Sequence, residues 1–186
     1  FRSLCLTQTS IFRLNNTFIK KIDDEALAIH EFWKALACAH ECVCSDSNGK
    51  IEYNGVSPDD VELVKTAASQ GYSLLKSPSN IRKILIGNVT HEYEILNILN
   101  FSSERKRMSI VLKEGNNIKV YTKGADCEIK KRLSKNSSKK YFTAITKGID
   151  IFSAKGYRTL MIAEKTITQD EYMKWSEKLR NGEMNL

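Results

Sequence analysis

The feature that most constrains the fold is a pair of β-rich segments joined by a short polar turn. Residues 108–113 and 118–123 are rich in β-branched side chains, and only Glu-Gly-Asn-Asn separates them. This spacing is typical of an antiparallel hairpin. A second pair of segments, 81–86 and 93–99, flanks a polar turn at Gly87-Asn88, and residues 158–163 are also strand-like. The sequence therefore predicts a mainly antiparallel sheet.

Helix start and stop signals lie on both sides of these strands. Ser57 suits an N-cap, Pro58 the first helical position and Asp60 the place of a capping-box acid. Helices that come in pairs beside hairpin-linked strands favour an α+β fold, in which a twisted, mainly antiparallel sheet is flanked by helices. The polar residues 44–54 are predicted to form a turn. The predicted helices cover residues 25–40, 57–71, 126–133, 139–155 and 168–182.

The length of 186 residues suits a single domain, with a linker or strand at residues 1–24 and a core at 25–186. No apolar run approaches the roughly 20 residues that span a bilayer, and the first twelve residues lack the apolar core of a signal peptide. The formal charge of +7 favours an anionic partner. Five cysteines, an odd number, make a poor disulfide framework and favour a reducing, cytosolic setting.

A cluster of three thiols and one imidazole is the first candidate site: Cys38, His40, Cys42 and Cys44. These are zinc-ligand types, but the second pair of ligands found in common structural zinc sites is missing. We therefore favour core packing at the end of a helix over a metal site. The sequence has no G-x-S-x-G motif and neither glycine-rich phosphate fingerprint. The chain alone is not expected to be catalytic.

Cations and an aromatic residue at predicted strand ends form the second candidate. The basic run 105–107 precedes one strand, Lys123 ends the next, and Arg158 begins a later one. Strand ends of one sheet often meet at one edge, where their loops contact ligands. Phe101 would add an aromatic face for a base, which together with the cations predicts a nucleotide pocket. The alternatives are a solvated basic loop and core packing of Phe101.

Longer segments around these residues resemble a known family, the nucleotide-binding domain of type IV P-type ATPases, the phospholipid flippases. The matches follow the order of that family from about residue 36 to residue 175, which is nearly the whole chain. The matching segments are LACAHECV (36–43), EYNGVSPDDVELVKTAASQGYSLL (52–75), YEILNILNFSSERKRMS (93–109), YTKGAD (121–126) and FSAKGYRTLMIA (152–163).

In that family the domain holds ATP by its adenine end and extends the triphosphate toward a separate phosphorylation domain. Position by position, the resemblance implies that Phe101 stacks on adenine. It also implies that Lys123 lines the base pocket and contacts the nucleotide, and that Arg158 reaches the ribose or a phosphate. These roles agree with the chemistry of a π-face for a base and of cations for phosphate.

The resemblance implies further residues around this centre. Gly124 and Ala125 lack bulky side chains and would let a base approach the backbone closely. The family has glutamate where this chain has Asp60, whose shorter side chain is either a ligand contact or mainly a helix cap. The residues that would shape the pocket beside them are Ser103, Arg107 and Met108.

The resemblance breaks down at the start of the chain. The phosphorylated motif of the family is D-K-T-G-T-L-T-Q, whereas this chain begins FRSLCLTQ. An ungapped match places Phe1 at the aspartate, and phenylalanine has no nucleophilic oxygen. Either this short match is accidental, or the parent is a degenerate pump. Guanylate cyclases of apicomplexan parasites carry such a degenerate flippase-like half, and the lysine-, isoleucine- and asparagine-rich composition suits that source.

The leading interpretation is an ATP-binding N domain of a P4-ATPase-like membrane protein, which would support phospholipid translocation. The alternative is a degenerate regulatory module of a bifunctional guanylate cyclase with weak nucleotide binding. Either parent implies a cytosolic domain, with the phosphorylation and actuator domains of the same chain as partners and Mg²⁺ only in the intact parent. A monomer without membrane insertion is expected. A nucleic-acid partner is not expected, because the charges are scattered along the chain.

Overall fold

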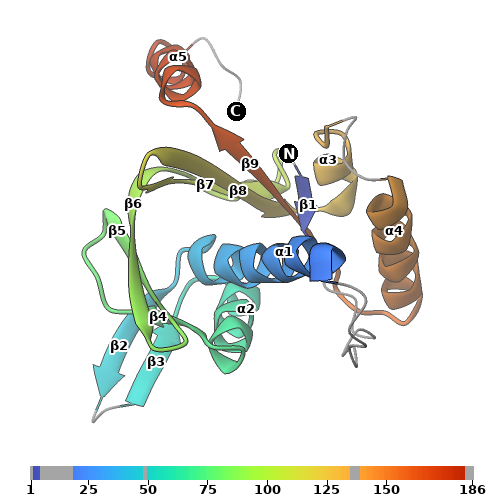
Figure 1. Ribbon diagram of the computed structural model, residues 1–186, viewed down its shortest axis with the longest axis horizontal. Helices are drawn as coiled ribbons and strands as arrows, with labels where there is room; N and C mark the ends of the chain where they lie inside the picture. The colour runs from blue at the N-terminus through green and yellow to red at the C-terminus, as the bar shows by residue number, and fades with distance from the viewer. Residues whose placement is uncertain (1, 5–18, 48–49, 135–138, 183–186) are drawn as a thin grey trace.

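The computed structural model describes residues 2–4, 19–47, 50–134 and 139–182. A seven-stranded antiparallel sheet in the order β1-β9-β8-β7-β6-β5-β4 forms its centre, and β2 and β3 pair separately (Figure 1). The strands are β1 (Arg2–Leu4), β2 (Val43–Ser47), β3 (Lys50–Asn54), β4 (Tyr72–Leu75), β5 (Ile81–Ile86), β6 (Val89–Leu99), β7 (Arg107–Glu114), β8 (Asn117–Gly124) and β9 (Met161–Ile167). The helices are α1 (Ile19–Cys38), α2 (Pro58–Ser69), α3 (Asp126–Lys130), α4 (Lys139–Ala154) and α5 (Gln169–Arg180).

The predicted α+β fold with an antiparallel sheet is confirmed. The β7–β8 hairpin closes at the pair Glu114–Asn117, and β5 and β6 are joined at Gly87 and Asn88. Gly115 turns the first hairpin with φ of +59°, a left-handed conformation that glycine adopts without a steric penalty. The two turns that join the central strands could therefore be predicted from their glycine and asparagine residues alone.

The N-cap signals of α2 and α5 are also confirmed. The Ser57 hydroxyl accepts a hydrogen bond from the backbone N–H of Asp60 and caps α2, while Thr168 and Glu171 form a full capping box at the start of α5. Within the described residues, none of the helices combines the length and the apolar character that crossing a membrane requires.

Several parts of the prediction were wrong in detail. α1 begins at Ile19 rather than at residue 25, and β6 begins at Val89 rather than at residue 93. Residues 44–54 do not form only a turn, since most of them belong to the β2–β3 hairpin. β4 was not predicted as a strand, although it pairs with β5 along its length. β9 begins at Met161 rather than at Arg158 and continues to Ile167. The N-terminal residue Phe1 lies outside the described residues.

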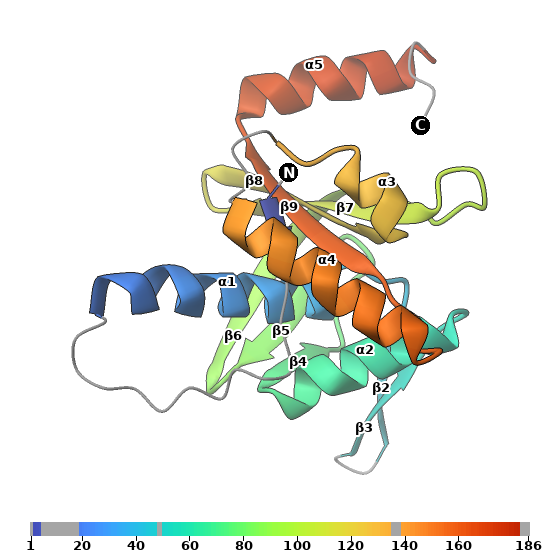
Figure 2. The same ribbon diagram turned by 90° about the vertical axis from the view of Figure 1, so that its right-hand side faces the viewer.

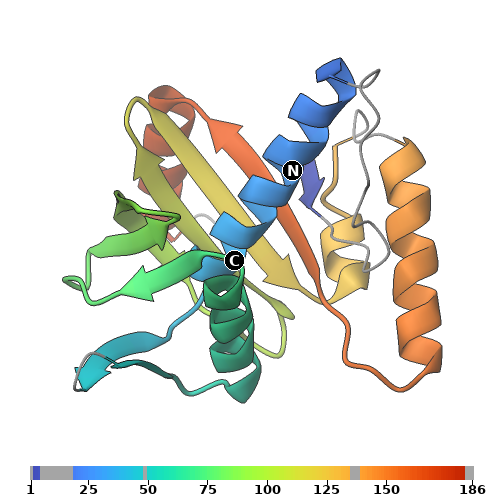
Figure 3. The same ribbon diagram turned by 60° about the horizontal axis from the view of Figure 1, so that its bottom comes forward.

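The helices cover the two faces of the sheet unequally. α1 crosses one face and α5 lies over the other (Figures 2 and 3). Because side chains alternate along a strand, Ile110 and Tyr121 point toward α1 and join the main core, while Ala163 points away. On this second side, Ile129 of α3 and Ile145 of α4 pack with Ala163 in a smaller core.

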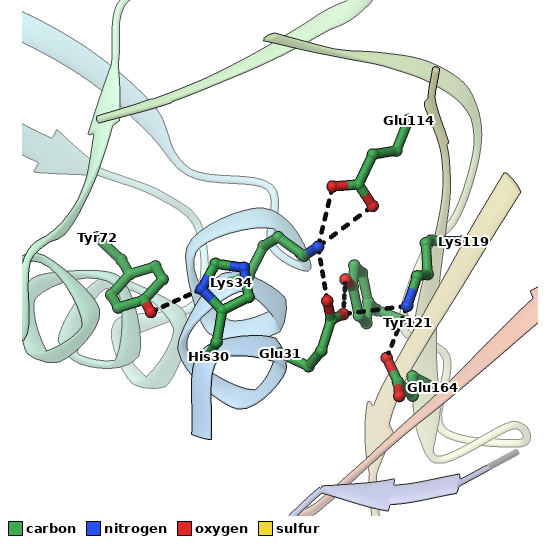
Figure 4. A network of polar contacts seen from close by, with 8 residues as sticks. All are labelled: His30, Glu31, Lys34, Tyr72, Glu114, Lys119, Tyr121 and Glu164. Atoms are coloured by element: carbon green, nitrogen blue, oxygen red, sulfur yellow. Dashed lines mark hydrogen bonds and ion pairs between the residues drawn. The ribbon is translucent and has the colours of Figure 1, made fainter. Parts of the chain in front are cut away.

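A buried network of charged and polar groups ties α1 to the sheet (Figure 4). The Nζ of Lys34 lies 2.8 Å from Oε1 of Glu31, and the Tyr121 hydroxyl donates a hydrogen bond of 2.5 Å to Oε2 of the same carboxylate. The Nζ of Lys119 lies 3.3 Å from Oε2 of Glu31 and 3.3 Å from Oε2 of Glu164. Glu31 and Lys34 are only 4% and 2% exposed, so this end of the core depends on full pairing of its charges. The residues drawn are His30, Glu31, Lys34, Tyr72, Glu114, Lys119, Tyr121 and Glu164.

Candidate functional site

The strand ends that carry the predicted site residues meet at one edge of the sheet. Leu99 at the end of β6 pairs with Ser109, and Arg107 at the start of β7 pairs with Gly124 at the end of β8. Gly124 pairs in turn with Met161 at the start of β9. The loops after β6 and β8 and the segment before β9 therefore emerge together, as the strand pattern predicted.

The centre of this edge is an ion pair between the sheet and the first turn of α2. The Nζ of Lys123 lies 2.7 Å from Oδ1 of Asp60, and the two side chains are 6% and 18% exposed. Burial lowers the pKa of Lys123, while the negative charge of Asp60 acts in the opposite direction. The backbone N–H of Asp60 serves the Ser57 cap, and its carboxylate is directed to Lys123. Ser57 therefore caps α2, and the Asp60 carboxylate contacts Lys123 instead of serving as the acid of a capping box.

A second ion pair lies beside the first, on the same turn of α2. Nη1 of Arg158 contacts Oδ1 of Asp59 at 3.1 Å, and the side chains are 86% and 46% exposed. A solvent-exposed pair of this kind contributes about 0–1 kcal/mol, so Arg158 can exchange Asp59 for another anion at little cost. Asp59 was not among the predicted residues, although two acids at the start of a helix are a recognisable signal because they complement the helix dipole.

The loop between β6 and β7 presents an aromatic ring to solvent. Phe101 is 62% exposed, which argues against the alternative that it packs in the core. Ser102 holds the loop in shape, because its carbonyl accepts from the N–H of Lys106 at 2.8 Å and its hydroxyl accepts from the N–H of Arg105 at 3.1 Å. Ser103 lies in the same loop and is exposed. An exposed ring on an ordered loop is suited to stacking on a planar ligand.

Gly124 is required by a close backbone approach. A Cβ at this position would lie 2.3 Å from the carbonyl oxygen of Lys106 and 2.6 Å from Cα of Arg107. The same carbonyl accepts a hydrogen bond of 2.9 Å from the N–H of Ala125, which precedes α3. Lys106 itself has φ of +51°, so the turn before β7 is tightly specified. The expected role of glycine was access for a base, and the structure supplies a packing reason in addition.

The two remaining predicted residues lie on opposite faces of the sheet. Met108 is 3% exposed, pairs in register with Lys123 and belongs to the main core. Arg107 is its neighbour in sequence, so its side chain points to the other face, where Nη1 donates to the carbonyl of Arg105 at 2.8 Å. The structure therefore brings Lys123, Asp60 and Met108 together and separates the Arg107 guanidinium from them.

The thiol and imidazole cluster packs at the end of α1. Nδ1 of His40 accepts the backbone N–H of Cys42 at 3.0 Å, so the proton is on Nε2, which donates to the carbonyl of Ala37 at 2.8 Å. Burial and the positive charge of Arg82 lower the pKa of His40 to about 3. Burial raises the pKa of the Cys38 thiol to about 12. Both ring nitrogens are engaged by the backbone, and the described residues contain no grouping of three metal-ligand side chains.

Comparison with known proteins agrees with this geometry. Residues 28–186 match the family model described as P-type ATPase, cytoplasmic domain N. The chain is 35% identical over 157 residues to phospholipid-transporting ATPase dnf2 of Schizosaccharomyces pombe, a region that is 84% of this chain and 11% of that protein. It is 36% identical over 152 residues to human phospholipid-transporting ATPase IC, a region that is 81% of this chain and 12% of that protein. It is also 33% identical over 164 residues to phospholipid-transporting ATPase tat-1 of Caenorhabditis elegans, a region that is 86% of this chain and 14% of that protein.

The chain thus spans only about an eighth of the length of these relatives. The family model is that of a cytoplasmic domain, which confirms the location predicted from the resemblance. The chain belongs to the P-type ATPases as their cytoplasmic domain N, and its similarity to phospholipid-transporting members places it in the type IV branch.

Proposed function

We propose that residues 1–186, as a single nucleotide-binding domain, bind ATP at the sheet edge where Lys123 meets α2. The adenine stacks on Phe101, Lys123 lines the base pocket and contacts the nucleotide, and Arg158 reaches the ribose or a phosphate. The observation that carries the proposal is the Lys123–Asp60 pair. A lysine buried at a loop-lined edge is costly to desolvate and is typical of a functional site.

The other proposed residues support this centre. Met108 packs beside Lys123, Ser103 belongs to the loop of Phe101, and Gly124 and Ala125 form the backbone wall at the end of β8. Arg107 would contribute through its backbone at the start of β7, because its side chain lies across the sheet. Asp59 and Asp60 are each engaged by a cation. We therefore assign no metal ligand here and expect Mg²⁺ with ATP only in the intact parent.

In the intact parent the domain would present the triphosphate to the phosphorylation domain and work with the actuator domain to support phospholipid translocation. The relatives compared above are named as phospholipid-transporting ATPases, which favours this parent over a regulatory module of a guanylate cyclase. The alternative would keep the fold but bind ATP weakly. Calorimetry and NMR titration of the chain with ATP test the proposal, and no shift near Phe101 or Lys123 at millimolar ATP would contradict it.

Replacing Phe101 with alanine is expected to weaken ATP binding about tenfold, because stacking of a base on an aromatic ring is worth about 1–3 kcal/mol. The ring is mainly exposed, so the midpoint of thermal unfolding is expected to stay unchanged. Phe142→Ala on α4, which removes another exposed phenylalanine, is the matched control and should leave ATP affinity unaltered. Calorimetric titration measures both variants, and equal losses of affinity would rule out stacking by Phe101.

Replacing Lys123 with alanine is expected to weaken ATP binding by tenfold or more, because a hydrogen bond to a charged group contributes about 1.5–3 kcal/mol. The Lys123→Ala/Asp60→Ala double variant avoids leaving a buried carboxylate unpaired and keeps the test valid if the single variant unfolds. Lys65→Ala removes a lysine of α2 that is paired with Glu62 on the surface, and it serves as the control. Unchanged ATP affinity in the double variant, measured by calorimetry, would remove Lys123 from the site.

A further inference from the structure

A cavity of about 330 Å³ lies on the face of the sheet opposite Lys123. Its floor is apolar and comes from Val111, Val120 and Ala163, whose side chains point away from α1. Trp175 of α5 and Ile129 of α3 provide walls. The volume falls within the range of about 300–1,000 Å³ that is usual for small-molecule sites.

The rim of the cavity is strongly basic. Four cationic side chains and one acidic side chain line it: Arg105, Arg107, Arg132, Lys165 and Glu171. The acid is already engaged, because the Glu171 carboxylate accepts the N–H of Thr168 at 2.8 Å in the capping box. Arg132 is paired with Glu128 at 2.9 Å, and Lys165 lies 3.9 Å from Glu171, while Arg105 and Arg107 donate to backbone carbonyls. The rim thus keeps an excess of positive charge beside apolar walls, which is complementary to an anion that also carries an apolar body.

The guanidinium groups repel one another. Burial and the charge of Arg132 lower the pKa of Arg105, and burial together with Arg132 and Arg105 lowers that of Arg107. An anion bound among these guanidinium groups would relieve their repulsion.

We propose that this cavity binds an organic anion that has a compact apolar body and one phosphate or carboxylate group. The apolar body rests on Val111 and Val120 beside Trp175, and the anionic group lies among Arg105, Arg107 and Arg132. The site is separate from the proposed ATP site, because neighbouring residues of β7 and β8 point to opposite faces of the sheet. Failure of ATP binding would therefore leave this proposal standing.

Binding of octyl phosphate to the 186-residue chain, followed by NMR, tests the proposal. We expect saturable shifts of the Val111 and Val120 methyl groups and of the Trp175 indole N–H. Decanoate in a parallel titration shows whether a carboxylate is accepted as well as a phosphate. Octyl glucoside, which lacks the charge, and inorganic phosphate, which lacks the apolar body, are each expected to bind at least tenfold more weakly.

The variant Arg132→Gln is expected to weaken octyl phosphate binding about tenfold, since it removes one charge-assisted contact. Lys131→Gln is the matched control, because this neighbour on the same turn also pairs with Glu128 but does not line the cavity. Val120→Phe fills the floor and is expected to abolish binding.

Three results would overturn the proposal: equal binding of octyl glucoside or inorganic phosphate, equal losses in the Arg132 and Lys131 variants, or shifts centred on Phe101 and Lys123. The last result would mean that the probe occupies the proposed ATP site instead. If Val120→Phe does not fold, the comparison of Arg132→Gln with Lys131→Gln decides the matter alone.

Discussion

A Gly124→Ala variant is expected to be less stable than the wild-type chain by about 3 kcal/mol, the upper part of the usual range for overpacking. The added Cβ would lie 2.3 Å from the carbonyl oxygen of Lys106 and 2.6 Å from Cα of Arg107. Both are backbone atoms in the turn before β7, so no side-chain rotation can relieve the overlap. Either the end of β8 or the turn must shift.

Gly148→Ala is the matched control, because the same substitution at that position is expected to raise the free energy of unfolding instead of lowering it. Gly148 lies within α4, and a Cβ built on it meets nothing within 4 Å. Alanine is favoured over glycine in a helix interior by about 0.5–1 kcal/mol, so this variant is expected to be more stable. Urea unfolding measures both free energies. Equal stability of the two variants would show that the Gly124 approach is not a constraint.

A Glu31→Gln variant is expected to lose about 3–5 kcal/mol of stability, because removing one partner of a buried ion pair leaves the other charges uncompensated. Glu31 accepts from Lys34 at 2.8 Å, from Tyr121 at 2.5 Å and from Lys119 at 3.3 Å (Figure 4). Among the described residues, Lys34 would keep Glu114 as its remaining ionic partner, at 3.1 Å. The attachment of α1 to the sheet would therefore weaken.

The control for burial is Glu62→Gln on α2. Its partner Lys65 lies 2.8 Å away, the same distance as between Glu31 and Lys34, but both side chains are more than half exposed. This surface pair is expected to contribute at most about 1 kcal/mol. If Glu31→Gln fails to fold, Tyr121→Phe removes one hydrogen bond of the same carboxylate and is expected to destabilise by about 1.5–3 kcal/mol. If Glu31→Gln and Glu62→Gln lower the free energy of urea unfolding by similar amounts, burial does not determine how much these ion pairs contribute to stability.

Acid titration gives a second measurement of the same network. Burial opposes the ionisation of Glu31, but hydrogen bonds from Lys34 and Tyr121 outweigh it and lower its pKa below the ordinary 4.5. A carboxyl with a lower pKa in the folded state contributes stability that is complete above the unfolded pKa and is lost as the pH falls through the folded one. The stability difference between the wild type and Glu31→Gln is therefore expected to shrink as the pH falls below about 4.

The elements that sequence could predict are those specified by local signals. Gly115 in a two-residue turn and Ser57 before Pro58 require no distant partner, and both were identified correctly. The β2–β3 hairpin was missed because β2 is mainly polar and lacks alternation, and because the turn cluster between the strands drew the whole segment into one turn. β3 alternates between polar and apolar residues (KIEYN), a strand signal that the prediction did not use. The contact between Glu31 and Tyr121 joins residues 90 positions apart, and no periodicity can reveal it.

For the candidate site, residue types could be predicted better than their orientation. Strand-end cations and Phe101 indicated the edge of the sheet where the proposed site lies, and the resemblance added a ligand-contact role for Asp60. The opposite orientations of Arg107 and Met108 depend on the register of β7, which one residue of slippage would invert. The cavity behind the sheet could not be predicted, because its walls come from β7, β8, α3 and α5 together.

The ion pairs at the first turn of α2 also bear on selectivity. The chain carries a formal charge of +7, yet Lys123 and Arg158 are already neutralised by Asp60 and Asp59. An extended polyanion binds by exchanging mobile counterions for free cations, and it would gain little at Lys123, whose partner Asp60 is a fixed and largely buried carboxylate. A nucleotide also offers a planar base to the exposed ring of Phe101. The proposed site would thus favour a ligand that carries a planar base over a polyanion that binds by charge alone.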